Sequence, residues 1–252
     1  MVEKVKGGEP KEKEQIPGIK QLLIDAVLSP KVAIPSGIET INIETLDVEG
    51  EKLTTMFLCD PSGGEYGIQL VVRKGKLLAT KKVFRGQITS TGAEIVCNIP
   101  EFVRTGVVTD NSPRQYVFNM LWAAFMHSHA IGDCPQSPTD VCHLVRGMDD
   151  PKLQPCSFVT TTTDHLLVFR SAATPNLDTE KLEQLLAEWN FAVDHYLNYI
   201  ERQKTQAADG GKLTVSECNY QSQILAIYAK RLNLLLYKGN IGEGVVRKVD
   251  RF

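Results

Sequence analysis

The sequence lacks the motifs that mark secreted, membrane-spanning and common nucleotide-binding proteins. It has no Asn-x-Ser/Thr sequon, no cysteine pair in CxxC spacing and no P-loop or dinucleotide fingerprint. Its longest apolar run, Val117 to Met126 broken only by Asn119, is too short to span a bilayer. The first fifteen residues are charged rather than apolar, so we expect no signal peptide. We therefore predict reduced thiols, no membrane span, and a location in the cytoplasm or in an intracellular virion.

An excess of charge of either sign is also missing. The 252 residues carry a formal net charge of -2, with 42% hydrophobic and 23% charged residues. Such values are typical of a globular chain and exclude a wholly disordered or rod-like one. Near-neutrality argues against a polyanion binder that uses its whole surface, but it leaves room for a local basic groove.

Composition along the chain predicts three segments. Residues 1–15 mix Lys and Glu with two glycines and a proline, which is typical of a flexible N-terminal arm. Residues 16–239 have regular apolar patterns throughout and are expected to form a single α+β core. Residues 240–252 are interrupted by glycine, so we expect a C-terminal tail.

The first half of the core is expected to form an N-terminal antiparallel β-sheet, either a meander or a small barrel. Apolar residues alternate with polar ones between Ala33 and Asn98, and Lys74-Gly75 indicates a hairpin turn. Ser112-Pro113 then indicates a helix start, and apolar residues surround the following segment as far as His129. Because a helix that is apolar on all sides is buried, we predict a buried central helix over 112–129.

The second half predicts a short helix from Ser137-Pro138, a small β-hairpin and two long helices. The hairpin covers 158–162 and 166–169. The first long helix has apolar residues at three- and four-residue spacings from Leu182 to Ile200, and the second covers about Ser216 to Tyr237. A glycine-containing loop joins them, so we expect an antiparallel helix pair.

One group of residues has side chains that zinc accepts as ligands: His127, His129, Cys134, Cys142 and His143. The predicted helix places the first two histidines two residues apart at its end, where such side chains point to opposite sides. Prolines also separate the cysteines. We therefore assign no metal and no cofactor, and no cysteine or histidine is assigned a catalytic role.

Basic residues gather in two places. One group follows the predicted hairpin and comprises Arg73, Lys74, Lys76, Lys81, Lys82 and Arg85, and the other lies near the C-terminus and comprises Lys230, Arg231, Arg247, Lys248 and Arg251. A basic hairpin with the nearby Phe84 could bind the backbone of a single-stranded nucleic acid. Lysines also protect edge strands from aggregation, which is the alternative interpretation.

The two ends offer apolar residues for contacts between copies of the chain. These residues are Val2, Val5, Ile241, Val245, Val246, Val249 and Phe252. The organisation favours a non-enzymatic, self-assembling structural protein, of the kind found in viral coat, nucleocapsid or matrix layers. Its partners would be copies of itself and single-stranded nucleic acid. The alternatives are an intracellular hydrolase or transferase that uses Cys and His, and an adaptor that binds another protein.

Overall fold

The computed structural model describes residues 16–29, 32–48, 51–52, 66–79, 84–85, 87–89, 92–94, 120–129, 134–148, 150, 153–206 and 217–252. Four helices lie in these ranges: α1 (Ile19–Leu28), α4 (Pro138–Val145), α5 (Thr179–Gln206) and α6 (Glu217–Arg231). None of these helices is long and apolar enough to cross a membrane. The N-terminal arm predicted for residues 1–15 lies outside the described residues.

The strands of the first half are β1 (Thr40–Asn42), β2 (Asp47–Val48), β3 (Glu51–Lys52), β4 (Tyr66–Arg73), β5 (Lys76–Ala79), β6 (Phe84–Arg85), β7 (Gln87–Thr89) and β8 (Gly92–Glu94). Those of the second half are β9 (Met120–Ser128), β10 (Cys156–Thr160), β11 (Asp164–Arg170), β12 (Leu234–Asn240) and β13 (Val245–Val249). The α+β class is therefore confirmed.

Nine of these strands form one mixed sheet, in the order β1-β13-β12-β11-β10-β9-β4-β5, with β6 also paired to β4. β9 and β10 are parallel, and the other pairs in this sheet are antiparallel. The strand pairs β2-β3 and β7-β8 form two small separate sheets. The predicted hairpins are present: β4 turns into β5 at Lys74-Gly75, and β10 pairs with β11.

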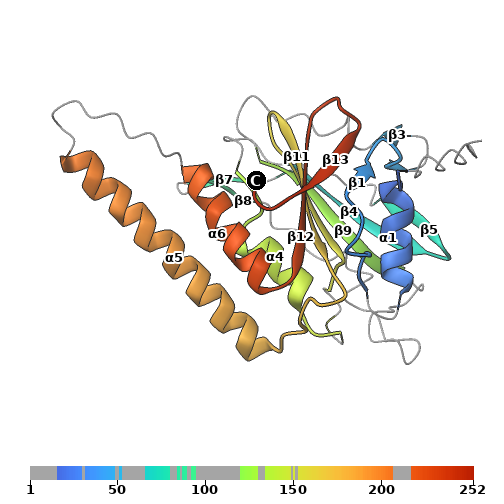
Figure 1. Ribbon diagram of the computed structural model, residues 1–252, viewed down its shortest axis with the longest axis horizontal. Coiled ribbons are helices and arrows are strands. Elements are labelled where there is room, and N and C mark those ends of the chain that lie inside the picture. Colours follow the sequence, from blue (N-terminus) through green and yellow to red (C-terminus); the bar gives the residue numbers. More distant parts are fainter. Residues whose placement is uncertain are drawn as a thin grey trace, which may run out of the picture.

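Helices cover both faces of the large sheet, with α1 on one face and α4, α5 and α6 on the other (Figure 1). Successive side chains of a strand point to opposite faces of the sheet, so one strand contributes residues to the apolar cluster on each face. In β11, Leu167 and Phe169 join the cluster with α1, and Val168 joins the cluster with the three other helices. Each face of this central strand is thus apolar, as expected for a sheet covered on both sides.

The antiparallel helix pair is confirmed at α5 and α6. Trp189 of α5 stacks on Tyr228 of α6, and the later residue Tyr196 of α5 stacks on the earlier residue Tyr220 of α6. The two helices therefore run in opposite directions. The apolar stripe of α5 is buried at Leu182, which is 6% exposed, and at Trp189, which is 2% exposed. Burial of this stripe stabilises α5 far more than its intrinsic helix propensity does.

The buried central helix is wrong over the described part of its range. Residues 120–128 form β9, which lies between β4 and β10. The run is apolar because both sheet faces are covered at this position, and a buried strand and a buried helix look alike in composition. A bulge at Leu70/Val71 of β4 accompanies the pairing and shifts its register.

The second long helix and the tail also differ from the prediction. α6 ends at Arg231 rather than near Tyr237, and Asn233 takes a left-handed conformation (φ 53°) that stops it. Residues 234–240 and 245–249 then form the β12–β13 hairpin in the large sheet. Gly242 and Gly244 have positive φ in the turn, so these glycines make a hairpin and not a free tail.

Candidate metal centre

A group of polar side chains lies where β9 ends and α4 begins. β9, α4 and β10 form a βαβ unit, because α4 connects two neighbouring parallel strands. In such units ligands bind beyond the carboxyl ends of the strands. His127 is near the end of β9, His129 follows it directly, and Asp140 is in the first turn of α4.

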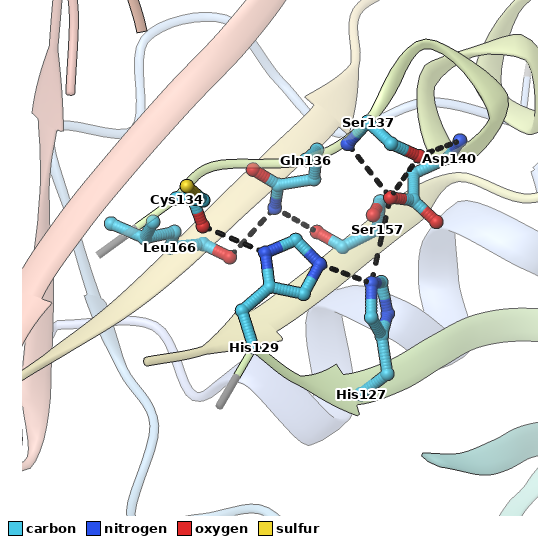
Figure 2. Close-up of polar contacts among 8 residues, drawn as sticks. All are labelled: His127, His129, Cys134, Gln136, Ser137, Asp140, Ser157 and Leu166. Carbon is cyan, nitrogen blue, oxygen red and sulfur yellow. Dashed lines mark hydrogen bonds and ion pairs between the residues drawn. The ribbon is translucent and has the colours of Figure 1, made fainter. Parts of the chain in front are cut away.

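The two histidines point to the same side of the sheet. Side chains two residues apart share a face in a strand, whereas they diverge in a helix. The Nε2 atoms of His127 and His129 lie 3.1 Å apart (Figure 2). Phe125, two residues earlier, stacks on the His127 ring with centroids 5.0 Å apart. The expectation that the histidines point to opposite sides is therefore wrong, and the reason is that the segment is a strand.

Asp140 approaches the same point from α4. Its Oδ2 atom lies 3.5 Å from Nε2 of His127. Ser137 is the N-cap of α4, and both its backbone N–H (2.8 Å) and its hydroxyl (2.7 Å) donate to Asp140 Oδ2. Burial raises the pKa of Asp140, but the charge of His127 and the hydrogen bonds from His127 and Ser137 outweigh it and hold this pKa well below its usual range. Asp140 is thus a fixed carboxylate that carries a negative charge.

His129 is held by the backbone of the segment that precedes α4. Its Nδ1 lies 2.8 Å from the carbonyl oxygen of Cys134. A carbonyl can only accept, so Nδ1 carries the hydrogen and Nε2 presents its lone pair toward His127. Burial, followed by the charge of His127, lowers the pKa of His129 to about 4. Near neutral pH its imidazole is neutral, the form that binds metal ions.

The three ligand atoms converge on one point, which favours a metal ion over a proton relay. A relay through a histidine uses both ring nitrogens, one toward each neighbour. Here His129 and Asp140 both face the same Nε2 of His127. The three atoms lie within 4.8 Å of one another. A tetrahedral zinc ion with bonds of about 2.0–2.1 Å spaces its ligand atoms about 3.3 Å apart. The two distances from His127 Nε2, 3.1 Å to His129 and 3.5 Å to Asp140, bracket this value, and the third separation is within 4.8 Å.

The described thiols do not supply a nucleophile. Cys134 is disulfide-bonded, which disagrees with the expectation of uniformly reduced thiols. Cys142 and Cys156 are free and buried. Burial raises the pKa of the Cys142 thiol to about 11 and that of Cys156 well above its usual value. Both remain protonated near neutral pH, so neither favours the Cys/His alternative.

The first basic group is only partly within the described residues. Arg73, Lys74 and Lys76 are exposed at the β4–β5 turn. Lys81 and Lys82 lie outside the described residues, and Arg85 belongs to β6 without a described side chain. These cations therefore gather at the tip of a hairpin whose strand β5 ends the strand order of the sheet.

The second basic group surrounds the β12–β13 hairpin and the end of α6. Lys230 and Lys248 line one open cavity of about 810 Å³. Arg231 pairs with Glu188 and Arg247 pairs with Glu243, both at 2.8 Å, while Lys248 contacts Glu39 at 3.2 Å. Arg251 is exposed. Six strand spacings of about 4.8 Å separate β13 from β5, so about 29 Å divides the two groups and they do not form one groove.

The residues expected to make assembly contacts have different environments. Val2 and Val5 lie outside the described residues. Ile241 is 45% exposed, and Val245 and Val249 are half-buried. Val246 is fully buried in the core beside α1, so its predicted contact with a neighbouring copy is wrong: β13 uses it inside its own chain. Phe252 packs, partly buried, on the core beneath α4, α5 and α6.

No protein family, curated protein or solved structure matches the chain. The site therefore has to be interpreted from its own geometry.

Proposed function

We propose that the protein is a metal-dependent hydrolase that binds one divalent ion of the zinc type through His127, His129 and Asp140. The observation that carries this proposal is the convergence of two imidazole Nε2 atoms and one carboxylate oxygen within 4.8 Å. Two of the three ligands come from one strand end and the third from the helix that follows it.

The donor set supports zinc chemistry. Imidazole nitrogen and carboxylate oxygen together suit Zn²⁺, and the absence of a thiolate from the group distinguishes it from closed structural sites built on cysteine. Three protein ligands leave one tetrahedral position for water or substrate. Binding of a divalent ion would displace the proton of His127, and the ion with two neutral histidines and one carboxylate would then keep a net charge of +1. An ion in such a site lowers the pKa of its water to near 7 and polarises a carbonyl or phosphoryl oxygen.

The surroundings of the ligands support the same assignment. The Cys134 carbonyl orients His129, and Ser137 orients Asp140 with two hydrogen bonds. Metal sites rely on such outer contacts to fix the tautomer of a histidine and the direction of a carboxylate. His127 is 5% exposed, so its Nε2 lies in a region of low dielectric constant where a charge–ligand interaction is strong.

Metal binding is tested first. The purified protein is stripped with chelator, titrated with Zn²⁺, dialysed and analysed for bound metal. We expect one ion per chain, lost in His127→Ala and in Asp140→Asn. His195→Ala is the matched control, because His195 is exposed on α5 and stacks only on Phe191 among the described rings. Substoichiometric zinc in the unmodified protein, or full binding by His127→Ala, would contradict the proposal.

Activity is tested next on chromogenic carboxylic ester, amide and phosphoester substrates. We expect hydrolysis of at least one class by the zinc-loaded protein, loss on chelation, and recovery when Zn²⁺ is restored. Asp140→Asn should abolish it while His195→Ala retains it. Stoichiometric zinc without hydrolysis of any class would indicate a structural metal site instead.

A self-assembling structural protein that coats single-stranded nucleic acid stays our second proposal, with a place in the cytoplasm or an intracellular virion. The three exposed cations at the β4–β5 turn and the exposed side chain of Ile241 favour it. Size-exclusion chromatography with the absorbance ratio at 260 and 280 nm tests it directly. Large species rich in nucleic acid are expected, and a clean monomer would contradict it.

A further inference from the structure

Gln136 lies in residues 134–137, the described part of the β9–α4 connection that directly precedes α4. It is only 2% exposed, although glutamine is normally a surface residue. Its side-chain amide Nε2 donates to the carbonyl oxygen of Leu166 in β11 at 2.8 Å and to that of Ser157 in β10 at 3.3 Å (Figure 2). Both hydrogens of the amide are therefore used to tie the segment to the sheet.

The residues around Gln136 hold two of the three candidate metal ligands. Two positions before it, the Cys134 carbonyl accepts from His129. One position after it, Ser137 donates twice to Asp140. Residues 134–137 belong to no helix or strand, so their own backbone ladder does not fix them. The hydrogen bonds of Gln136 join this segment to β10 and β11, and the disulfide of Cys134 adds a covalent link at the start of the segment.

The other half of the Gln136 amide gives an independent argument. Its Oε1 atom is buried and has no hydrogen-bond partner. A buried oxygen without a partner is unfavourable, so an apolar side chain of the same size would serve packing as well or better. Packing alone therefore does not account for glutamine at this position, whereas the two donated hydrogen bonds do.

We propose that Gln136 is the positioning residue of the metal centre, which places the orienting partners of His129 and Asp140 at once by anchoring residues 134–137 to β10 and β11. This inference rests on the proposed metal-binding function. Gln136 itself touches neither the ion nor a substrate. Ligand atoms have to be held within about 0.5 Å of their productive positions, and loss of an outer-shell contact typically lowers metal affinity 10–100-fold.

The test compares Gln136→Met with the unmodified protein. Methionine keeps the volume but removes both donors and the unpartnered oxygen. The carbonyls of Ser157 and Leu166 then lose a donor, so the thermal midpoint should fall, and circular dichroism checks that the variant is folded. We expect Zn²⁺ affinity, measured by chelator competition, to fall at least about 10-fold. With Co²⁺ as the spectroscopic probe, the d–d bands of the bound ion should also shift or weaken. Gln154→Met is the matched control, because Gln154 is likewise buried (3% exposed) and lies beyond the end of α4.

The outcomes separate the two proposals. If the unmodified protein binds no Zn²⁺, the proposed function fails. If it binds Zn²⁺ and Gln136→Met binds equally well with an unchanged Co²⁺ spectrum, the role of Gln136 is overturned. If Gln136→Met does not fold, Gln136→Asn replaces it in the test, because its side chain keeps an amide but is too short to reach both carbonyls. Wild-type Zn²⁺ affinity in Gln136→Asn would overturn the positioning role of Gln136. In the unmodified protein, ¹⁵N NMR must find His129 protonated at Nδ1, and the opposite tautomer also overturns it.

Discussion

Trp189 of α5 and Tyr228 of α6 stack face to face, with ring centroids 4.3 Å apart and planes inclined by 6°. Both rings are largely buried, and they join the cluster that also contains Leu225 and Leu236. The stack therefore connects the two helices to each other and to the sheet beneath them. The same helices are joined at the surface by the Arg231–Glu188 ion pair, which is exposed and contributes little to stability.

We predict that Trp189→Ala lowers the free energy of unfolding by roughly 3–5 kcal/mol, the usual range for deleting a buried aromatic side chain. This loss of stability has two sources: the buried apolar surface of the Trp189 ring is lost, and a cavity is left beside Tyr228. Urea denaturation followed by circular dichroism measures it. Phe191→Ala is the control, because Phe191 is 71% exposed and its removal should change stability by less than about 0.5 kcal/mol. Equal effects of the two changes would contradict the packing of α5.

Ser137→Ala should affect both the helix and the site. Ser137 caps α4 through a reciprocal pair of contacts with Asp140, and loss of such a cap costs about 0.5–2 kcal/mol. The change also removes the hydroxyl contact that orients the candidate ligand oxygen, so Zn²⁺ affinity should fall about 10-fold or more. Thr139→Ala, an exposed position in the same turn, should leave affinity unchanged. Lower stability with unaltered zinc affinity would restrict Ser137 to capping.

Several elements could be predicted from the sequence because their signals are local. Ser137-Pro138 marks the start of α4, Lys74-Gly75 marks the β4–β5 turn, and the spacing from Leu182 to Trp189 marks the buried face of α5. Each signal depends on residues a few positions apart. Such local signals can be recognised without knowledge of the rest of the chain.

β9 could not be distinguished from a helix in this way. A strand covered on both faces has no alternation, and its apolar residues depend on which elements pack over it. The same problem applies to β12, whose residues Leu234, Leu236 and Tyr237 are buried and continue the apolar pattern of α6. Asn233, which tolerates the left-handed conformation that ends the helix, is the local signal that could have separated them.

The sequence does not reveal the candidate site, for a reason that follows from β9. His127 and His129 are residue types that bind zinc, but a helix would point their side chains apart, whereas the strand points them to the same side. Asp140 adds the third ligand only because α4 folds back over the end of β9, which is a long-range relationship. Gln136 gives no sequence signal at all, since a glutamine beside a helix start is usually on the surface.

Stability should depend on pH through His165. This residue is 2% exposed, lies near Thr160, and has its pKa lowered from 6.5 to about 4 by burial, against the opposing charge of Asp164. The unfolded chain therefore binds a proton that the folded chain does not. The contribution of neutral His165 is fully present above about pH 6.5 and is lost as pH falls toward 4, with a slope of about 1.4 kcal/mol per pH unit.

His165→Gln tests this dependence. We expect the variant to lose stability less steeply than the unmodified protein when urea denaturation is repeated between about pH 4.5 and 6. His129, whose pKa is lowered in the same direction, contributes a similar slope to both proteins and cancels in the comparison. Parallel curves for the two proteins would show that His165 can be protonated in the folded state.

The cations at the β4–β5 turn give the most direct test of nucleic-acid binding. Lys74 and Lys76 are exposed and separated by Gly75, whose positive φ of 72° makes the tight turn. The sheet order places this hairpin at one end of the sheet and the second basic group near the other end, so each group has to be tested alone. A phosphate contact carries no base information, and Lys74→Ala with Lys76→Ala should therefore weaken binding to all single-stranded sequences alike.

The measurement is fluorescence anisotropy with labelled single-stranded RNA at several salt concentrations. Each lost phosphate contact should lower the slope of log affinity against log salt by about 0.7, so the double change should lower it by about 1.4. Lys181→Ala is the control, because Lys181 is exposed at the start of α5 and already pairs with Asp178. If the slope and affinity do not change, these lysines only protect the edge strand β5. In that case a second pair of changes, Lys230→Ala with Arg251→Ala, moves the test to the second basic group near the other end of the sheet, where Lys230 lines the cavity beside β13.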